Sequence, residues 1–141
     1  MSTLAGWKRL ADIVKSPHNG ITFDCGVTRE LGEDPVTVAR YFGSRDCINH
    51  VHYRNVIVRK PYEKYTEVFL DEGQVNMFAV MQELVKLKYT RGLYPEHPRA
   101  LDIDRERGIK SGYVNVGGGG FAGEIYNVGY AKAMLQAVLS R

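Results

Sequence analysis

The sequence predicts an α/β protein built on a parallel sheet, and three observations carry the prediction. Short runs rich in β-branched and aromatic residues start near Ile21, Ile48 and Arg91. Segments with apolar residues at helical spacing precede and follow these runs. Strand and helix patterns alternate, and successive parallel strands need helical crossovers. The length of 141 residues favours a single domain, 1–141.

The first third of the chain is expected to form a helix, a strand and a second helix. Apolar residues recur at helical spacing over 4–14, and a buried strand is expected over 21–26. Asp34 offers an N-cap and the proline after it suits the first helical turn, so a helix is expected over 35–42, with Gly43 as its stop.

Two further strand and helix units complete the expected pattern. A strand over 48–56 is followed by a polar loop over 59–76 and an amphipathic helix over 77–87. A short strand over 91–97 is expected to end at its proline, which cannot donate to a ladder.

The last part of the chain is expected to be a charged loop, a glycine run and a helix. These fall at Asp102–Lys110, Gly117–Gly120 and 126–139. The glycine-rich loop before the helix could cradle an anion with its backbone N–H groups or serve as a linker.

Composition and charge exclude several classes of protein. The 19 Lys and Arg residues exceed the 16 Asp and Glu residues by only three, which is too little for a dedicated nucleic-acid binder. The sequence lacks an apolar run long enough to span a bilayer and lacks the pattern of a signal peptide at its start. Its two cysteines do not make a disulfide framework. We therefore expect a cytoplasmic protein without membrane or nucleic-acid partners.

Polar side chains gather where the expected strands end. Asp24 and Cys25 follow the first strand, His52 to Asn55 end the second, and Glu96 and His97 end the third. In α/β sheets and barrels, active sites are built at the carboxyl ends of the strands. A complete eight-stranded barrel takes about 250 residues, so this chain can form only part of one.

Four segments carry a resemblance to a known family. They are Gly20-Ile21-Thr22-Phe23-Asp24-Cys25-Gly26, His52-Tyr53-Arg54-Asn55-Val56, Asp71-Glu72-Gly73-Gln74-Val75-Asn76-Met77 and Pro95-Glu96-His97. In these segments the chain resembles the C-terminal part of the mannonate dehydratase family, metal-dependent enzymes of the xylose-isomerase-like barrel class. The resemblance implies a partial (β/α) TIM-barrel of about three parallel strands. It runs from about Gly20 to Leu139, which is less than half of a full-length member.

The resemblance implies a metal site at the strand ends. His52 matches a metal-binding histidine of the family, and Glu96 stands where the family has a metal-binding aspartate. If Gly26 is aligned on the family's glycine, Asp24 occupies the position of a metal-binding cysteine and Cys25 falls one place later. A further histidine ligand of the family comes from an earlier strand that the resemblance does not cover.

The residues themselves allow both functional and structural interpretations. His52 is a metal ligand or a hydrogen-bonded core histidine, and Asp24 and Glu96 are ligands or caps of the turns that follow. Together the three offer oxygen and nitrogen donors, which suit Mn²⁺ or Mg²⁺, and Mn²⁺ is the cofactor we expect. Cys25 is either a fourth ligand or a buried apolar side chain.

Three more residues are candidates for catalysis. In the resemblance, His97 is the proton carrier, a role that its ordinary pKa suits. His97 and Glu96 can face one pocket only if the strand ends at the proline before them. Arg54 and Asn55 are expected to orient a substrate carboxylate or hydroxyl, although an arginine at a strand end is also often solvated.

The expected function is a metal-dependent lyase that dehydrates a sugar acid such as D-mannonate to a 2-keto-3-deoxy acid. The alternatives are a sugar isomerase or epimerase of the same barrel class, since fold does not determine function, and a non-catalytic barrel remnant. A three-stranded piece of a barrel would leave two open edges and an apolar inner face, so a homo-oligomer, most simply a dimer, is expected.

Overall fold

The computed structural model describes residues 3–106 and 120–140. The elements in these ranges are α1 (Leu4–Ile13), β1 (Ile21–Asp24), α2 (Cys25–Glu30), α3 (Pro35–Gly43), β2 (Ile48–His52), β3 (Asn55–Lys60), β4 (Lys64–Val68), α4 (Met77–Lys86), β5 (Leu93–Tyr94), α5 (Asp102–Glu106) and α6 (Phe121–Leu139). The glycines at 117–119, expected to cradle an anion or act as a linker, lie outside the described residues.

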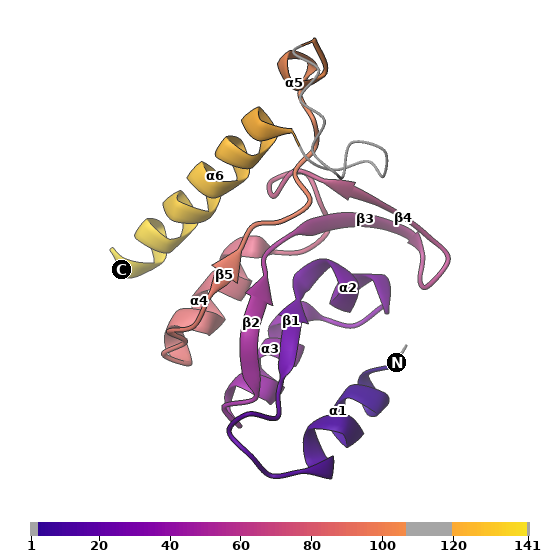
Figure 1. Ribbon diagram of the computed structural model, residues 1–141, viewed down its shortest axis with the longest axis vertical. Helices are drawn as coiled ribbons and strands as arrows, with labels where there is room; N and C mark the ends of the chain where they lie inside the picture. Colours follow the sequence, from indigo (N-terminus) through magenta and orange to yellow (C-terminus); the bar gives the residue numbers. More distant parts are fainter. Residues whose placement is uncertain (1–2, 107–119, 141) are drawn as a thin grey trace.

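Three strands form the expected parallel sheet, with β2 between β1 and β5 (Figure 1). Asp24 at the end of β1 pairs with His52 at the end of β2. His52 pairs in turn with Tyr94, the last residue of β5. The three strands therefore end level with one another, and the residues at and just after their ends meet at one edge of the sheet.

A β-hairpin replaces the continuous strand and polar loop expected after Ile48, and that prediction was wrong. β2 ends at His52, and the chain leaves the parallel sheet before Asn55 begins β3, which pairs with β4 in an antiparallel two-stranded sheet. Charged residues at the exposed tip of the hairpin made it look like a loop, although edge strands carry such residues routinely. The hairpin arches over the carboxyl edge of the sheet (Figure 1).

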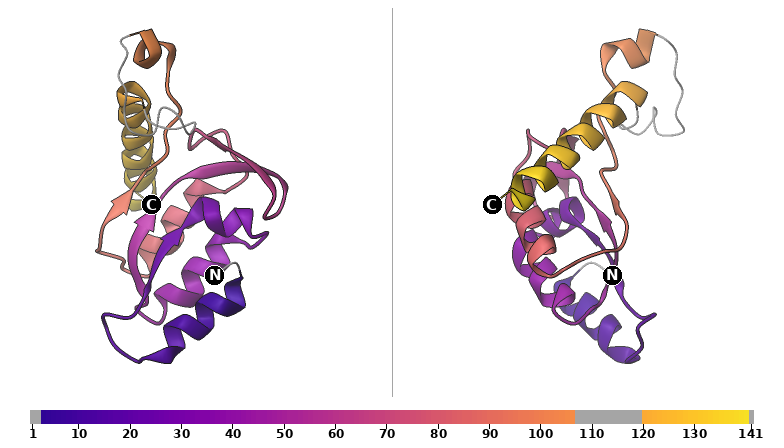
Figure 2. Two further views of the ribbon diagram at one scale, coloured as in Figure 1. Left: turned by 45° about the vertical axis from the view of Figure 1, so that its right-hand side comes forward. Right: turned by 90° about the vertical axis from the view of Figure 1, so that its left-hand side faces the viewer.

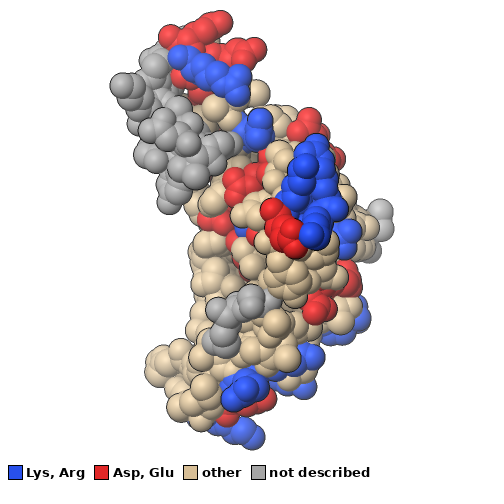
Figure 3. Space-filling model, turned by 90° about the vertical axis from the view of Figure 1, so that its right-hand side faces the viewer, with Lys and Arg blue, Asp and Glu red and all other residues tan. Residues whose placement is uncertain are grey.

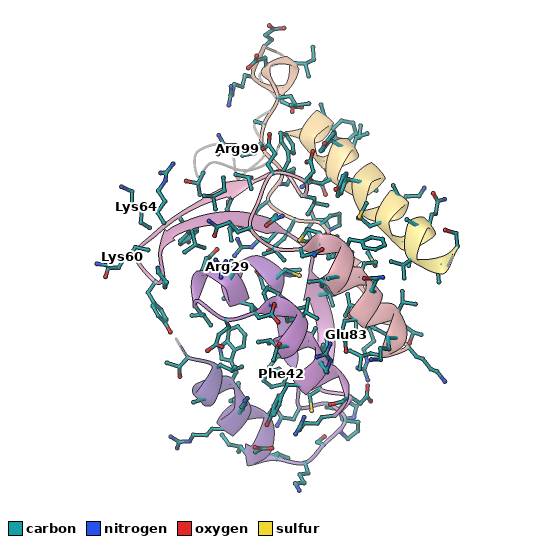
Figure 4. The ribbon with its side chains drawn as sticks, turned by 180° about the vertical axis from the view of Figure 1, so that it is seen from behind. Arg29, Phe42, Lys60, Lys64, Glu83 and Arg99 are labelled. Atoms are coloured by element: carbon teal, nitrogen blue, oxygen red, sulfur yellow. The ribbon has the colours of Figure 1, made fainter. Side chains whose placement is uncertain are left out.

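The hairpin is anchored at its turn. Tyr62 has a positive φ of 66°, and its backbone N–H donates to the carbonyl of Glu30 at 2.9 Å. Lys60 and Lys64, on either side of the turn, point outward from the tip (Figure 4). The backbone of the turn is thus held against α2, while the lysine side chains on either side of it extend into solvent.

The helices α3 and α4 cover one face of the parallel sheet, as the views from front and back show (Figures 1 and 4). The side chain of Asp34 accepts from the backbone N–H of Thr37 and caps α3, as predicted. The core between helices and sheet includes Phe23, Cys25, Val38, Phe42, Ile48, Val51, Tyr53, Val80, Met81 and Leu84.

The opposite face of the sheet is polar, which corrects the expected apolar inner face. Phe23 and Val51 are fully buried in the core. Thr22 and Tyr94 are exposed, and His50 is half-buried. The chain therefore buries one face of its strands and leaves polar and aromatic side chains on the other.

The helix α6 begins at Phe121, five residues before the expected start. Asp104 of α5 explains this, because its carboxylate accepts from the backbone N–H groups of Ala122 at 2.8 Å and Gly123 at 3.4 Å. The two helices meet beyond the sheet, and α6 then runs back along α4 (Figure 2). Across residues 3–106 and 120–140, no helix has the length and apolar character needed to cross a bilayer.

Candidate active site

Asp24, His52 and Glu96 meet at the carboxyl edge of the parallel sheet. The first two end their strands, and Glu96 follows β5 by two residues. The Nδ1 atom of His52 lies 2.8 Å from Oε1 of Glu96 and 3.6 Å from Oδ2 of Asp24. One ligand atom from each of the three residues lies within 4.8 Å of the other two. Their geometry suits three donors around one cation.

Asp24 uses its two carboxylate oxygens differently. Oδ1 accepts from the backbone N–H of Val27 at 2.7 Å and caps α2. Oδ2 faces the site, 3.0 Å from Nε of Arg54. The structure thus combines the two roles that the sequence leaves open for this acid, because the cap holds one oxygen and turns the other toward His52.

Arg54 lies at the centre of an acidic cluster. Its Nε is 3.0 Å from Asp24 and 3.4 Å from Glu96. Its Nη1 is 2.9 Å from Glu30 and 3.5 Å from Glu67. Burial alone would lower the pKa of this guanidinium, but the surrounding carboxylates outweigh it and raise the pKa above its ordinary value. With a side chain only 6% exposed, Arg54 is an internal counter-charge.

Gly26 makes room for that guanidinium. A Cβ at this position would lie 2.5 Å from Nη1 and 2.7 Å from Cζ of Arg54. Any side chain at this first turn of α2 would therefore push the guanidinium away from Asp24.

Glu30 and Glu67 also contact Arg54, but the sequence did not predict that they lie at the site. Glu30 ends α2, and Glu67 comes from β4, inside the segment that looks like a solvated loop. The alternation over the hairpin could have revealed a strand there, but nothing local indicates that either carboxylate reaches Arg54. Burial raises the pKa of Glu30, and the nearby Arg54 only partly offsets this.

The side chains of His97 and Glu96 come together although the two residues are adjacent, because β5 ends at Tyr94. His97 has a positive φ of 52°, a backbone turn that a regular strand does not contain. Its Nδ1 lies 2.6 Å from Oε1 of Glu67, and its Nε2 lies 3.6 Å from Oε2 of Glu96. Burial raises the pKa of Glu96, and His97 and His52 partly counteract it.

Cys25 does not join the ligand group. It begins α2, is fully buried and packs in the apolar core. Burial raises the pKa of its thiol well above the ordinary value, and the nearby Asp24 adds to this. The structure supports the alternative that treats Cys25 as a small apolar side chain.

Asn55 contacts the backbone of the segment that precedes α4. Its Nδ2 donates to the carbonyls of Leu70 at 2.7 Å and Val75 at 3.1 Å. Its Oδ1 accepts from the N–H groups of Val56 and Val75, both at 2.9 Å. These four bonds use the capacity of the amide and give Asn55 a structural role, so the substrate contact expected for it stays a prediction without support from the geometry.

Acidic side chains outnumber the arginine at the centre of the site. Asp24, Glu30, Glu67 and Glu96 supply four carboxylates, and Arg54 supplies the lasting positive charge, with two imidazoles beside them. Figure 3 shows carboxylate surface in a hollow on one face of the molecule, next to Lys and Arg side chains. The oxygen and nitrogen donors of the Asp24, His52 and Glu96 group fit a hard divalent cation.

The fold and this site define a class: α/β proteins with carboxylates and imidazoles gathered at the ends of parallel strands. The family model "D-mannonate dehydratase (UxuA)" matches residues 1–140. The chain belongs to the mannonate dehydratase family, as its sequence motifs indicate.

Individual relatives agree with the family match. A mannonate dehydratase of Enterococcus faecalis is 38% identical over 104 residues, covering 70% of this chain and 28% of the relative. Mannonate dehydratase 2 of Agrobacterium fabrum is 28% identical over 127 residues, covering 83% of this chain and 31% of the relative. The crystal structure of mannonate dehydratase from Streptococcus suis serotype 2 superposes with a TM-score of 0.84 at 24% identity, covering 96% of this chain and 37% of that one. This chain therefore spans about a third or less of these curated relatives.

Proposed function

We propose that this chain carries the metal-binding and proton-transfer residues of a dehydratase that acts on D-mannonate. The observation that carries the proposal is the convergence of Asp24, His52 and Glu96 within 4.8 Å, with His97 directly beside them. Membership of the mannonate dehydratase family supports the choice of substrate. The product would be a 2-keto-3-deoxy acid.

In this proposal Asp24, His52 and Glu96 hold a divalent cation, Mn²⁺ in preference to Mg²⁺. Such an ion supplies stabilisation for the negative charge that grows on the substrate carboxylate as the neighbouring C–H bond is broken. The chain itself offers two anionic oxygens and one imidazole nitrogen to it.

His97 moves the proton. Dehydration removes the proton on C2 and the hydroxyl on C3, which leaves as water, and the resulting enol gains a proton at C3 as it becomes the ketone. An imidazole suits these transfers because its ordinary pKa lies near neutrality. Its Nε2 lies on the Glu96 side of the ring, facing the ligand group.

Arg54 holds the two acidic ligands in place. Its Nε lies within 3.4 Å of an oxygen of both Asp24 and Glu96, and its side chain is almost fully buried. The geometry supports this role better than the substrate contact expected from the sequence, which stays a prediction. Removal of Arg54 would therefore disturb the spacing of the ligands.

The fold supports a portion of a (β/α) barrel. The sheet is parallel, its strands end at the site, and the chain superposes on part of a mannonate dehydratase structure. In the described ranges β1 and β5 each have one neighbouring strand, so each leaves one edge open. A second copy of the chain, pairing at these edges, is the partner we propose, and the cytoplasm is the compartment.

The test is a sugar-acid assay on metal-loaded protein. Mn²⁺-loaded protein is incubated with D-mannonate, with D-gluconate and with a panel of ketoses, and keto-acid product is measured by a sensitive colorimetric assay. Keto acid from mannonate, with His97→Asn nearly inactive yet still binding metal, supports the proposal. Turnover of a ketose alone would favour an isomerase, and no turnover of any substrate would favour a non-catalytic barrel remnant.

A further inference from the structure

We propose that Glu67 is a positioning residue that fixes the tautomer of His97, an inference that deepens the proposed function and rests on it. The two side chains come from different parts of the fold. Glu67 lies on β4 of the hairpin, and His97 follows the last strand of the parallel sheet. The hairpin would then serve the site by delivering one carboxylate.

The contact between the two residues is short and partly shielded from solvent. Oε1 of Glu67 lies 2.6 Å from Nδ1 of His97, and the two side chains are 17% and 33% exposed. The backbone carbonyl of Glu67 also accepts from Nη1 of Arg99 at 3.4 Å. The segment after β5 therefore contacts β4 through both a side chain and the backbone.

The chemistry of the pair selects one tautomer. A carboxylate can only accept a hydrogen bond, so Nδ1 of His97 must carry the proton in the neutral ring. The hydrogen bond at one ring nitrogen then leaves the other, Nε2, without a proton. Nε2 is the nitrogen nearer to Glu96, and it becomes a base that faces the ligand group.

Glu67 is itself held in position. Its Oε1 lies 3.5 Å from Nη1 of Arg54, the same guanidinium that contacts the two acidic ligands. The hairpin turn is fixed to α2 by the hydrogen bond from Tyr62 to Glu30. The carboxylate thus links the ligand group to the proton carrier and sets the orientation of the imidazole.

The test reads the tautomer directly by ¹⁵N NMR of the imidazole groups in metal-free protein at a single alkaline pH. The chain has four histidines, and the His97 signals are identified by their loss in His97→Asn. In the parent, Nδ1 of His97 is expected to carry the proton and Nε2 to be unprotonated. Protonation at Nε2 instead would overturn the proposal, and this measurement requires no variant of Glu67.

Substitutions at Glu67 supply the second arm. Glu67→Gln keeps the size of the side chain but lets it either accept or donate a hydrogen bond. The Nδ1-protonated form of His97 should therefore no longer dominate in this variant. Glu67→Asp keeps the carboxylate and should retain part of the preference for that form. Glu63→Gln, on the exposed tip of the same hairpin and paired with Lys60, is the matched control and should leave the spectrum unchanged. An unchanged His97 spectrum in folded Glu67→Gln would also overturn the proposal.

Activity separates this inference from the function on which it rests. If mannonate is dehydrated, Glu67→Gln should lower kcat by about 10- to 100-fold with a smaller change in KM, as loss of an orienting hydrogen bond does. A normal kcat in that variant would contradict the positioning role. If the parent does not dehydrate mannonate, the proposed function fails, and the NMR result still decides the tautomer.

Discussion

Asp24 and Arg54 form an ion pair at the carboxyl edge of the sheet, with Oδ2 of the aspartate 3.0 Å from Nε of the arginine. The other oxygen of Asp24 caps α2 through Val27. Both oxygens are therefore held before any cation binds, and the ligand group is built on rigid elements.

His52→Ala should abolish stoichiometric metal binding. The imidazole of His52 is the nitrogen donor of the ligand group, and its loss leaves two carboxylates that both lie beside the Arg54 guanidinium. The metal content of purified protein, measured by mass spectrometry after Mn²⁺ loading, tests this. His50→Ala is the control, since the His50 ring packs edge-on against His52 at 5.3 Å and is not part of the group. Equal metal content in His52→Ala and the parent would remove this site from consideration.

Arg54→Gln should lower the free energy of unfolding by about 3–5 kcal/mol, because it leaves buried carboxylates without their counter-charge. The side chain of Arg54 is only 6% exposed and contacts Asp24, Glu30, Glu67 and Glu96. Urea unfolding at neutral pH measures the effect. A loss below about 1 kcal/mol, the range of an exposed ion pair, would show that the cluster is solvated.

Glu30→Gln should lower the free energy of unfolding much less than Arg54→Gln does. The stability of the Glu30→Gln variant relative to the parent should rise with pH. Burial raises the pKa of Glu30, so the folded state holds this proton more tightly than the unfolded state does. The stability from Glu30 is then fully present below its unfolded pKa and is lost as pH rises through its folded pKa. The glutamine variant lacks that loss. The free energies of unfolding of Glu30→Gln and of the parent, measured at acidic and at neutral pH, should therefore differ less at neutral pH. A larger difference at neutral pH would refute the assignment.

Glu83→Gln should destabilise the protein at neutral pH and have little effect in acid. The Glu83 carboxylate accepts from Nε of Arg40 at 2.9 Å and from Nη2 at 2.8 Å, joining α3 to α4. The hydrogen bonds from Arg40 hold the pKa of Glu83 below its ordinary value. Its stabilisation is thus present above the unfolded pKa and lost as pH falls through the folded pKa. Urea midpoints of variant and parent should differ at neutral pH and converge at low pH.

Cys25→Ser should retain the metal content of the parent. The Cys25 thiol is buried in the core, and the ligand group consists of Asp24, His52 and Glu96. In native protein a thiol reagent should react first with the half-buried Cys47, and with Cys25 only after unfolding. Loss of metal in a folded Cys25→Ser variant would instead make this cysteine a ligand.

The protein should be an oligomer, most simply a two-fold dimer. β1 and β5 each leave one edge of the described sheet unpaired, and unpaired edges are commonly covered by another chain. Sedimentation at micromolar concentration measures the mass. A monomer would contradict this prediction and would leave the strand edges exposed to solvent.

Local sequence signals were sufficient to predict the parallel sheet and the convergence of three polar side chains at its edge. Asp24, His52 and Glu96 lie at or just after strands, and parallel strands bring their carboxyl ends to one edge, so their convergence follows from the order of elements. Asp34 likewise predicted the start of α3, because an N-cap residue acts within the first turn of its own helix.

Only the tertiary structure decided which other residues join that edge. Glu30 and Glu67 reach Arg54 from 24 and 13 positions away in the sequence, through a short helix and a hairpin that resembled a loop. Cys25 and Asn55 are adjacent in the sequence to Asp24 and Arg54, yet Cys25 packs in the core and Asn55 holds a backbone segment. Neighbours along a chain can point in opposite directions, and contacts between distant segments depend on how the elements pack.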